Sequence, residues 1–185
     1  MNTETSGKST KKPLWGKTAF VFSAEVLCAV LLVVFDLFTK SAAAAELKGQ
    51  TPIVLIEGVL ELRYVQNTGA AFSLLENAQW LFILAAIAVI AVIAAVLVLL
   101  PNTRHYVPMH ILLTLIAAGA AGNLIDRITL HYVRDFIYFS LIDFPIFNVA
   151  DIYVTVSTVL LVLCILFYYE DEDFVFLHRS RRTAS

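Results

Sequence analysis

The chain alternates long apolar stretches with shorter polar segments. Four of the apolar stretches are long, and they are Thr18–Phe38, Trp80–Leu100, Tyr106–Ile125 and Ile152–Tyr169. A helix that crosses the hydrocarbon core of a bilayer, about 30 Å thick, needs about 20 residues. We therefore expect an all-α membrane protein built as a four-transmembrane-helix bundle. The run Ala117–Gly122 of small residues lets helices approach closely, so the third span is expected at the centre.

The connection between the first two spans, residues 41–79, is long for a small membrane protein. Its start, Ser41–Leu47, is rich in alanine and predicts a short interfacial helix. Further on, Ile53–Ile56 and Val59–Val65 flank the turn Glu57-Gly58, and the second arm alternates apolar and charged residues. That alternation is typical of a half-buried strand. The sequence thus predicts a β-hairpin within a small extracytoplasmic β-sheet.

Composition agrees with a protein whose solvent is lipid. Hydrophobic residues make up 59% of the chain and charged residues 15%, with a mean hydropathy of +0.81. A soluble domain carries about 25% charged residues. The net charge of −2 and the lack of a basic stripe exclude nucleic acid as a partner. Cys28 and Cys164 lie within apolar stretches, so we interpret them as apolar residues and not as a disulfide or metal site.

Lysine and arginine are distributed unequally between the two sides of the predicted bundle. One side carries Lys8, Lys11, Lys12, Lys17, Arg104, Arg179, Arg181 and Arg182. The other side carries Lys40, Lys48, Arg63, Arg127 and Arg134. By the positive-inside rule, both termini are expected in the cytoplasm. Residues 1–16 are then a disordered cytoplasmic leader, residues 17–169 the membrane domain, and residues 170–185 a cytoplasmic tail.

Polar residues cluster where the spans end on the external side. The clusters are Asp36–Lys40, Asn67–Ser73, Gly122–Arg127, Val133–Phe136 and Phe147–Asp151. Polar side chains are costly at membrane depth, so such residues usually have a function. Alternating topology brings all five clusters to one end of the bundle. We therefore expect them to form a single site near the outer face of the membrane.

Carboxylates that meet at such a site suit peptide hydrolysis. When two Asp side chains lie close together, one keeps a proton, and the pair then offers an acid and a base. The ionised carboxylate activates a water molecule while the protonated one polarises the scissile carbonyl. The histidines His105, His110, His131 and His178 are scattered along the chain, so neither a Ser/His or Cys/His nucleophile nor a histidine metal site is expected.

The five clusters, in this order along residues 20–168, resemble the sequence blocks of the signal peptidase II family. By that resemblance, Asp135 and Asp151 are the catalytic residues. The residues that match positions contacting the substrate or supporting the catalytic pair are Asn67, Gly69, Asn123, Arg127, Asn148, Asp36 and Lys40. The family usually has Gln after the first-span Asp, whereas this chain has Leu37.

The resemblance also implies the substrate and the reaction. The substrate is a prolipoprotein that already carries a diacylglyceryl group on a cysteine, and the cut falls on the N-terminal side of that cysteine. The resemblance implies no metal and no organic cofactor. We further expect a monomer surrounded by membrane lipid.

Each catalytic or supporting residue also has a structural interpretation. Asp135 can be a loop residue paired with Arg134 or Arg127, and Asp151 can cap the fourth helix. Asn67 and Asn123 each lie near a glycine, which is typical of turns. Asp36 and Lys40 can be a simple ion pair at a helix end.

Three other acidic residues lie outside the catalytic hypothesis. Asp126 is expected to pair with Arg127 or to cap loop backbone, and Asp143 to be solvated. Glu25 lies inside the first span and is protonated, paired with another span, or reaching toward the interface. A proton-coupled transporter that uses Glu25 and Asp36, and a non-catalytic membrane scaffold, are the competing functions.

Overall fold

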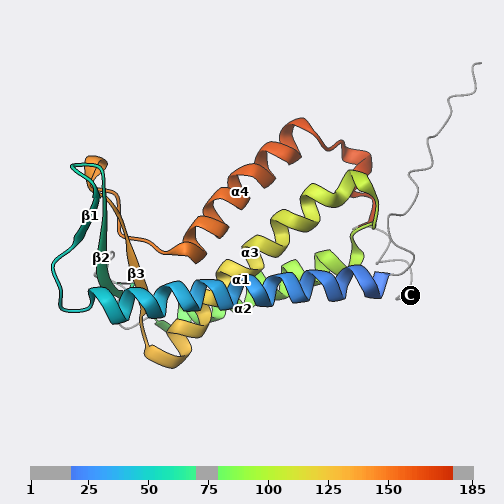
Figure 1. Ribbon diagram of the computed structural model, residues 1–185. Helices are drawn as coiled ribbons and strands as arrows, with labels where there is room; N and C mark the ends of the chain where they lie inside the picture. The colour runs from blue at the N-terminus through green and yellow to red at the C-terminus, as the bar shows by residue number, and fades with distance from the viewer. Residues whose placement is uncertain (1–17, 70–78, 177–185) are drawn as a thin grey trace, which may run out of the picture.

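The computed structural model of the protein describes residues 18–69 and 79–176. Its four long helices are α1 (Thr18–Leu47), α2 (Gln79–Leu99), α3 (Val107–Leu130) and α4 (Val149–Phe167). All four are long and apolar enough to cross a membrane. Figure 1 shows the helices as a bundle with a small sheet at one end, called the sheet end below. The predicted four-helix membrane fold is confirmed.

Helix α3 is the central helix of the bundle. Over half of its span, 56%, is buried within the protein, against 6% for α1 and 11% each for α2 and α4. Gly119 lets α3 and α4 approach closely, because a Cβ atom at this position would lie 2.5 Å from the carbonyl oxygen of Ala150 on α4. The run of small residues therefore has the packing role predicted for it.

The sheet has three antiparallel strands in the order β1-β2-β3. The strands are β1 (Ile53–Ile56), β2 (Leu60–Asn67) and β3 (Val133–Phe139). The first two form the predicted hairpin. The third was not predicted as a strand, although it contains one of the polar clusters. In its register with β2, Asp135 lies opposite Val65 and Val133 lies opposite Asn67.

The predicted interfacial helix is helical, but it is not separate from the first span. Residues Ser41–Leu47 are the last turns of α1. Alanine is the best helix former, and no helix breaker precedes Gly49, whose φ of 77° lies in the left-handed region that follows many helices. Within this extension, Ala43 and Leu47 are buried against Phe136 of β3. The continuous helix thus fixes the sheet to the bundle.

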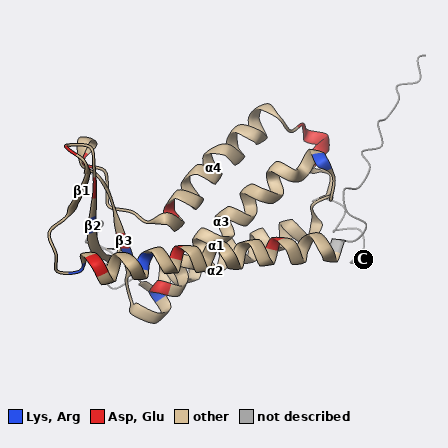
Figure 2. Ribbon diagram, viewed as in Figure 1, with Lys and Arg blue, Asp and Glu red and all other residues tan. Residues whose placement is uncertain are grey.

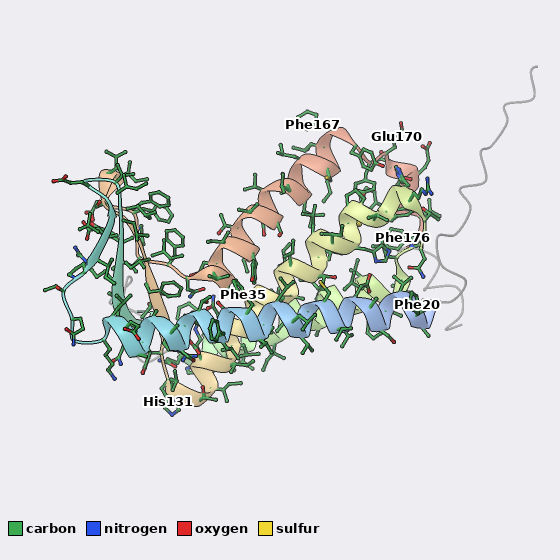
Figure 3. All side chains as sticks on the ribbon, in the orientation of Figure 1. Phe20, Phe35, His131, Phe167, Glu170 and Phe176 are labelled. Carbon is green, nitrogen blue, oxygen red and sulfur yellow. The ribbon has the colours of Figure 1, made fainter. Side chains whose placement is uncertain are left out.

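Apolar side chains cover the outward faces of α1, α2 and α4 (Figure 3), and large exposed residues such as Leu31, Val92 and Phe167 belong to this surface. Charged residues gather at the two ends of the bundle (Figure 2). The surface is that of a protein embedded in lipid.

The end of the bundle opposite the sheet is closed by the segment that follows α4. A short 3-10 helix, Asp171–Phe174, lies against the start of α3. Asp173 is paired with His105 at 2.7 Å, and its carbonyl accepts a hydrogen bond from the Tyr106 hydroxyl at 2.8 Å. The beginning of the predicted cytoplasmic tail is therefore folded onto the bundle, and residues 177–185 lie outside the described residues.

Candidate active site

Asp135 lies in β3 at the sheet end, and only 2% of it is exposed. Its carboxylate accepts hydrogen bonds from the side-chain amides of Asn67 at 2.8 Å and Asn148 at 2.6 Å. Asn67 reaches it from the diagonal position on the neighbouring strand, where side chains are within contact range. Within the described residues, Asp135 forms no ion pair with Arg134 or Arg127, so the interpretation as a locally paired loop residue is wrong.

Asp151 lies in the first turn of α4 and takes part in a capping box with Asn148. The Asn148 side chain accepts from the Asp151 backbone N–H at 3.1 Å, and the Asp151 carboxylate accepts from the Asn148 backbone N–H at 3.0 Å. The interpretation of Asp151 as a helix cap is therefore correct, but capping is not its only contact. The other carboxylate oxygen of Asp151 accepts a hydrogen bond from Asn123 at 2.8 Å, which ties it to α3 as well.

Asn148 connects the two aspartates. Its side-chain amide donates to Asp135 while its backbone N–H donates to Asp151, and the residue is fully buried. Burial raises the pKa of Asp135 to about 6; the hydrogen bonds from Asn67 and Asn148 oppose this rise, and the charge of Asp151 adds to it. Asp135 therefore retains its proton at a higher pH than an ordinary carboxyl group.

Asp36 and Lys40 support the site from α1, and both are fully buried. Asp36 accepts hydrogen bonds from Lys40 at 2.7 Å and from the backbone N–H of Ala150 at 2.9 Å. Lys40 in turn donates to the side-chain oxygen of Asn123 at 2.8 Å. The Asp36–Lys40 pair is confirmed, and it fixes both the start of α4 and Asn123, which contacts Asp151.

Gly122 makes this arrangement possible. A Cβ atom at this position would overlap Oδ2 of Asp36 and lie 3.1 Å from its Cγ. The next residue, Asn123, lies within α3 and not at its end, so the interpretation of Asn123 as a turn residue is wrong. Its fixed place in a helix lets it serve both Lys40 and Asp151.

Asp126 has a supporting role that the sequence did not reveal. Its expected pairing with Arg127 is wrong, because its carboxylate binds the guanidinium of Arg134, with contacts of 2.6 and 3.1 Å. Its carboxylate also accepts from the backbone N–H of Arg134 at 3.0 Å, so the backbone that it binds is that of strand β3 and not of a loop. The hydrogen bonds that Arg134 donates to Asp126 raise the pKa of Arg134, so its guanidinium keeps its charge. This pair fixes β3 against the end of α3, one residue away from Asp135.

Asp143 matches its predicted role. It is exposed and accepts a hydrogen bond from the Tyr138 hydroxyl at 2.6 Å, away from the two aspartates.

Gly69 and Arg127 lie on the α2 side of the site. Gly69 has a φ of 85°, and its N–H donates to the Asn67 side chain at 2.9 Å. Asn67 is therefore a turn residue as well as a partner of Asp135. The guanidinium carbon of Arg127 lies 5.4 Å from the ring centre of Phe82, and Arg127 also donates to the Asn123 carbonyl at 3.4 Å. The contact with Phe82 was not predicted, and residues 70–73 of the same cluster lie outside the described residues.

A cavity of about 270 Å³ opens beside Asp135. Its lining residues are Val65, Gln66, Asn67, Thr68, Asp135, Pro145 and Ile146. Among residues 18–69 and 79–176, no three His, Cys, Asp or Glu side chains are grouped so that they could hold a metal ion. The arrangement offers an acid and a base to a bound peptide, which is chemistry suited to hydrolysis.

Comparison with known proteins decides the family. The family model described as signal peptidase (SPase) II matches residues 28–167. The chain belongs to the signal peptidase II family. The family match spans every residue of the site described above.

Individual relatives agree with this membership. Proteins named lipoprotein signal peptidase from Streptococcus pyogenes serotypes M6 and M5 are each 38% identical to this chain over 149 residues, which cover 80% of this chain and 95% of each relative. A solved bacterial membrane enzyme structure, determined by the in meso method at 1.9 Å resolution, matches with a TM-score of 0.69 and 29% identity, covering 80% of this chain and 95% of the other. A second such structure, at 2.3 Å resolution, gives a TM-score of 0.65 and 28% identity, covering 78% of this chain and 88% of the other.

Membership of the signal peptidase II family also decides between the competing functions. The protein is a peptidase, and therefore a hydrolase. It is also a multi-pass bacterial membrane protein, with four helices long and apolar enough to cross the bilayer. The transporter and scaffold hypotheses are set aside.

Proposed function

We propose that the protein is an intramembrane aspartic endopeptidase that removes signal peptides from prolipoproteins. Its relatives are named lipoprotein signal peptidases, which supports this substrate class. The substrate carries a diacylglyceryl group on a cysteine, and the enzyme cuts on the N-terminal side of that cysteine. The observation that carries the mechanism is that Asn148 binds both aspartates while the pKa of Asp135 is raised to about 6.

In this mechanism Asp135 is the acid and Asp151 is the base. Asp135 is the more suitable proton carrier because its burial disfavours the charged form. Asp151 accepts hydrogen bonds from Asn123 and from the Asn148 backbone, and these hold its carboxylate in place to act as the base. Its carboxylate takes a proton from a water molecule, and the resulting hydroxide attacks the scissile carbonyl carbon while Asp135 protonates the carbonyl oxygen. As the tetrahedral intermediate collapses and its C–N bond breaks, the proton held by Asp151 passes to the leaving amine and one hydroxyl proton of the intermediate returns to Asp135, which restores both groups.

The remaining predicted site residues hold these groups or the substrate in place. Asn67 and Asn148 orient Asp135, while Asn123 orients Asp151 and is itself held by Lys40. Asp36 fixes the start of α4. Gly69 and Arg127 lie on the α2 side, where Arg127 is available to a substrate carbonyl.

The same proposal places the protein in its membrane. Both termini lie in the cytoplasm, so the sheet end and the active site lie near the outer face of the inner membrane. The leader of residues 1–16 and the tail of residues 170–185 are then cytoplasmic parts flanking a membrane domain of residues 17–169. The protein acts as a monomer among membrane lipids and needs no cofactor.

The test compares cleavage of a lipidated precursor by Asp135→Asn, Asp151→Asn and Asp143→Asn variants of the full chain. Asp143 is a matched control, because it is an exposed carboxylate whose partner is Tyr138. Each of the first two changes is expected to reduce kcat by at least about 10³-fold, since each removes a group that transfers a proton. Asp143→Asn is expected to retain the wild-type rate. Cleavage at the wild-type rate by either of the first two variants would contradict the mechanism.

The cleavage position is tested separately by mass spectrometry of the products. The proposal predicts that the lipidated cysteine is the first residue of the mature fragment. A fragment that begins elsewhere would contradict the proposed cut.

A further inference from the structure

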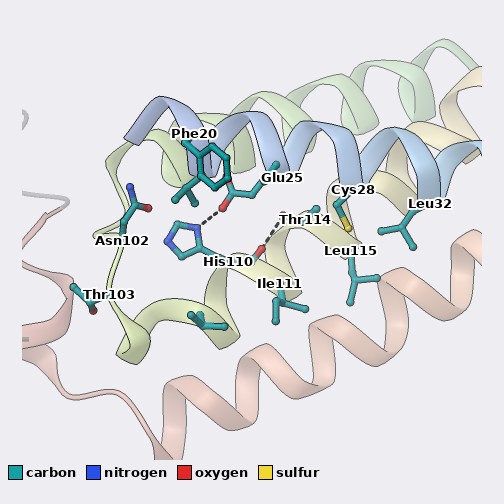
Figure 4. A pocket seen from close by; sticks show the side chains of 13 residues that line it. Phe20, Glu25, Cys28, Leu32, Asn102, Thr103, His110, Ile111, Thr114 and Leu115 are labelled. Atoms are coloured by element: carbon teal, nitrogen blue, oxygen red, sulfur yellow. Dashed lines mark hydrogen bonds and ion pairs between the residues drawn. The ribbon is translucent and has the colours of Figure 1, made fainter. Parts of the chain in front are cut away.

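Arg127 is a cation beside the active site that has no acidic partner among the described residues. Other charged groups of the bundle are paired. Glu25 on α1 forms an ion pair with His110 on α3, in the wall of a second cavity (Figure 4), which confirms one of the three interpretations of Glu25, the partner on another span. Lys40 and Arg134 are bound to acidic residues near the site. Arg127 therefore differs from the other cations around the two aspartates.

Three carboxylates lie close enough to attract the Arg127 guanidinium. The negative charges of Asp151, Asp135 and Asp126 all act on it. Arg127 lies one turn beyond Asn123 on α3 and donates to its carbonyl at 3.4 Å, while the Asn123 side chain donates to Asp151. A guanidinium beside a carboxylate commonly forms short, paired hydrogen bonds with it. A further contact is needed to hold Arg127 away from the carboxylates.

Phe82 provides this contact from α2, the one long helix that carries none of the predicted site residues. The guanidinium carbon of Arg127 lies over its ring, 5.4 Å from the ring centre, within the range of a cation–π interaction. The ring also packs on the turn after β2, because a Cβ atom at Gly69 would lie 2.9 Å from Cε2 of Phe82. In that turn Gly69 donates to Asn67, which donates to Asp135. Phe82 thus contacts both Arg127 and the turn that orients Asp135.

We propose that Phe82 is a positioning residue of the peptidase, whose ring holds the Arg127 guanidinium close to Asp135 and Asp151 but out of contact with both. This inference rests on the proposed roles of the two aspartates. An ion pair with Arg127 would favour the charged form of either carboxyl group. Asp151 would then be a weaker base, and Asp135 would lose its proton at a lower pH. Held against Phe82, Arg127 keeps N–H donors free for a carbonyl oxygen of the substrate.

The charged groups around Asp135 come from four elements. Asp151 on α4 raises the pKa of Asp135, and Lys40 on α1 lowers it. Arg134, the neighbour of Asp135 in β3, is already in an ion pair, and α2 contains no charged residue. Arg127 on α3 is the remaining cation. A movement of Arg127 toward the carboxylates is therefore expected to lower the pKa of Asp135.

Titration of the labelled Asp135 carboxyl group by carbon-13 chemical shift, in the full chain, tests the proposal. Phe82→Leu removes the ring face but keeps an apolar side chain. We expect the pKa of Asp135 to fall from about 6 by about one pH unit, because a cation in contact lowers the pKa of a carboxyl group. Phe82→Tyr keeps the ring face and should retain the wild-type pKa. An unchanged pKa in Phe82→Leu would overturn the proposal.

Arg127→Gln shows whether the effect passes through the guanidinium. In the Arg127→Gln background, Phe82→Leu should leave the pKa of Asp135 unchanged, because no cation is left to move. A decrease of the same size in both backgrounds would contradict the proposal, since the ring would then act on Asp135 without Arg127.

Cleavage of a lipidated precursor gives a second readout. Phe82→Leu is expected to lower kcat at least about tenfold and to shift the fall in kcat/KM to lower pH, and Phe82→Tyr should restore both. Phe167→Leu makes the same change on the exposed face of α4 and should leave the rate and the pH profile unchanged. A loss of kcat in Phe82→Leu without a shift in the pH profile would contradict the positioning role, because packing alone would then explain it.

A fluorinated phenylalanine in place of Phe82 provides the test if Phe82→Leu does not fold. Fluorination keeps the shape of the ring but weakens the negative charge of its face. We expect the pKa of Asp135 to fall as in Phe82→Leu, and an unchanged pKa would overturn the proposal. These titrations need no substrate, so they test the contact separately from the proposed function. The proposed function fails instead if Asp135→Asn cleaves the precursor at the wild-type rate.

Discussion

Replacing Gly122 with alanine tests whether the close contact between α1 and α3 holds the active site together. The added methyl group would overlap Oδ2 of Asp36, which is fully buried. Asp36 then has to move away from Lys40 and from the backbone N–H of Ala150, its partners at 2.7 and 2.9 Å. The displacement reaches Asp151 through Lys40 and Asn123.

The expected loss of stability follows from three contributions. Overpacking a filled core costs about 1–3 kcal/mol. Weakening a hydrogen bond to a charged group costs about 1.5–3 kcal/mol. Helix propensity favours alanine over glycine by about 1 kcal/mol and partly offsets these losses. We therefore expect Gly122→Ala to lower the free energy of unfolding by about 2–4 kcal/mol.

The assay is reversible unfolding in mixed detergent micelles, combined in a double-mutant cycle with Asp36→Ala. Removing the Asp36 carboxylate makes room for the new methyl group, while Lys40 keeps Asn123 and Asp126 as neighbours at 2.8 and 3.8 Å. In that background Gly122→Ala should cost less than about 1 kcal/mol, which gives a coupling energy of about 2 kcal/mol. An equal cost of Gly122→Ala in both backgrounds would refute the reasoning, because the overlap with Asp36 would then not be its cause.

Three further predictions concern the groups around Asp135. Because Asp135 must keep its proton, kcat/KM is expected to fall as the pH rises through about 6. The Asn67 hydrogen bond lowers the pKa of Asp135, so Asn67→Ala should shift this fall in kcat/KM to higher pH. The pKa of Asp135 is raised from 3.8 to about 6, so its contribution to stability is fully present below pH 3.8 and is lost as the pH rises through 6. Between pH 3 and pH 7, the free energy of unfolding of Asp135→Asn should therefore rise by about 3 kcal/mol relative to that of the wild type. Unfolding measured at each pH checks this difference. Asp126→Asn should lower the free energy of unfolding by about 3 kcal/mol, because it leaves Arg134 without its charged partner. Glu61→Gln, which breaks the Glu61–Arg63 pair at the surface, should lower it by less than about 1 kcal/mol.

The sequence predicted the membrane fold well because lipid imposes a simple rule. A span must be apolar for its whole length, so the positions of α2 and α4 could be read within a few residues of their observed bounds. The hairpin was equally predictable from alternation around Gly58. The continuation of α1 to Leu47 was missed because nothing in an alanine-rich segment marks the membrane boundary.

The predicted site residues lie together at the sheet end, but most of their contacts could not be predicted from the sequence. Asp36 and Lys40 are one turn apart on a helix, so their pairing follows from spacing alone. Asp126 and Arg134 are separated by the end of α3 and the start of β3, so their pairing depends on how the chain turns there. The strand β3 gave a weak signal, because Arg134 and Asp135 interrupt its apolar pattern where the site is built. For Glu25, only the packing of α1 on α3 reveals His110 as the partner.

The titration of Asp135 tests the central claim most directly, since the mechanism requires two coupled carboxyl groups with one proton between them. The measurement is the carbon-13 chemical shift of the labelled Asp135 carboxyl group as a function of pH, in the wild-type protein and in Asp151→Asn. We predict a pKa of about 6 in the wild type and a lower pKa in the variant, because the charge of Asp151 raises it. A pKa near the ordinary value of 3.8 in the wild type, or the same pKa in both proteins, would contradict the account.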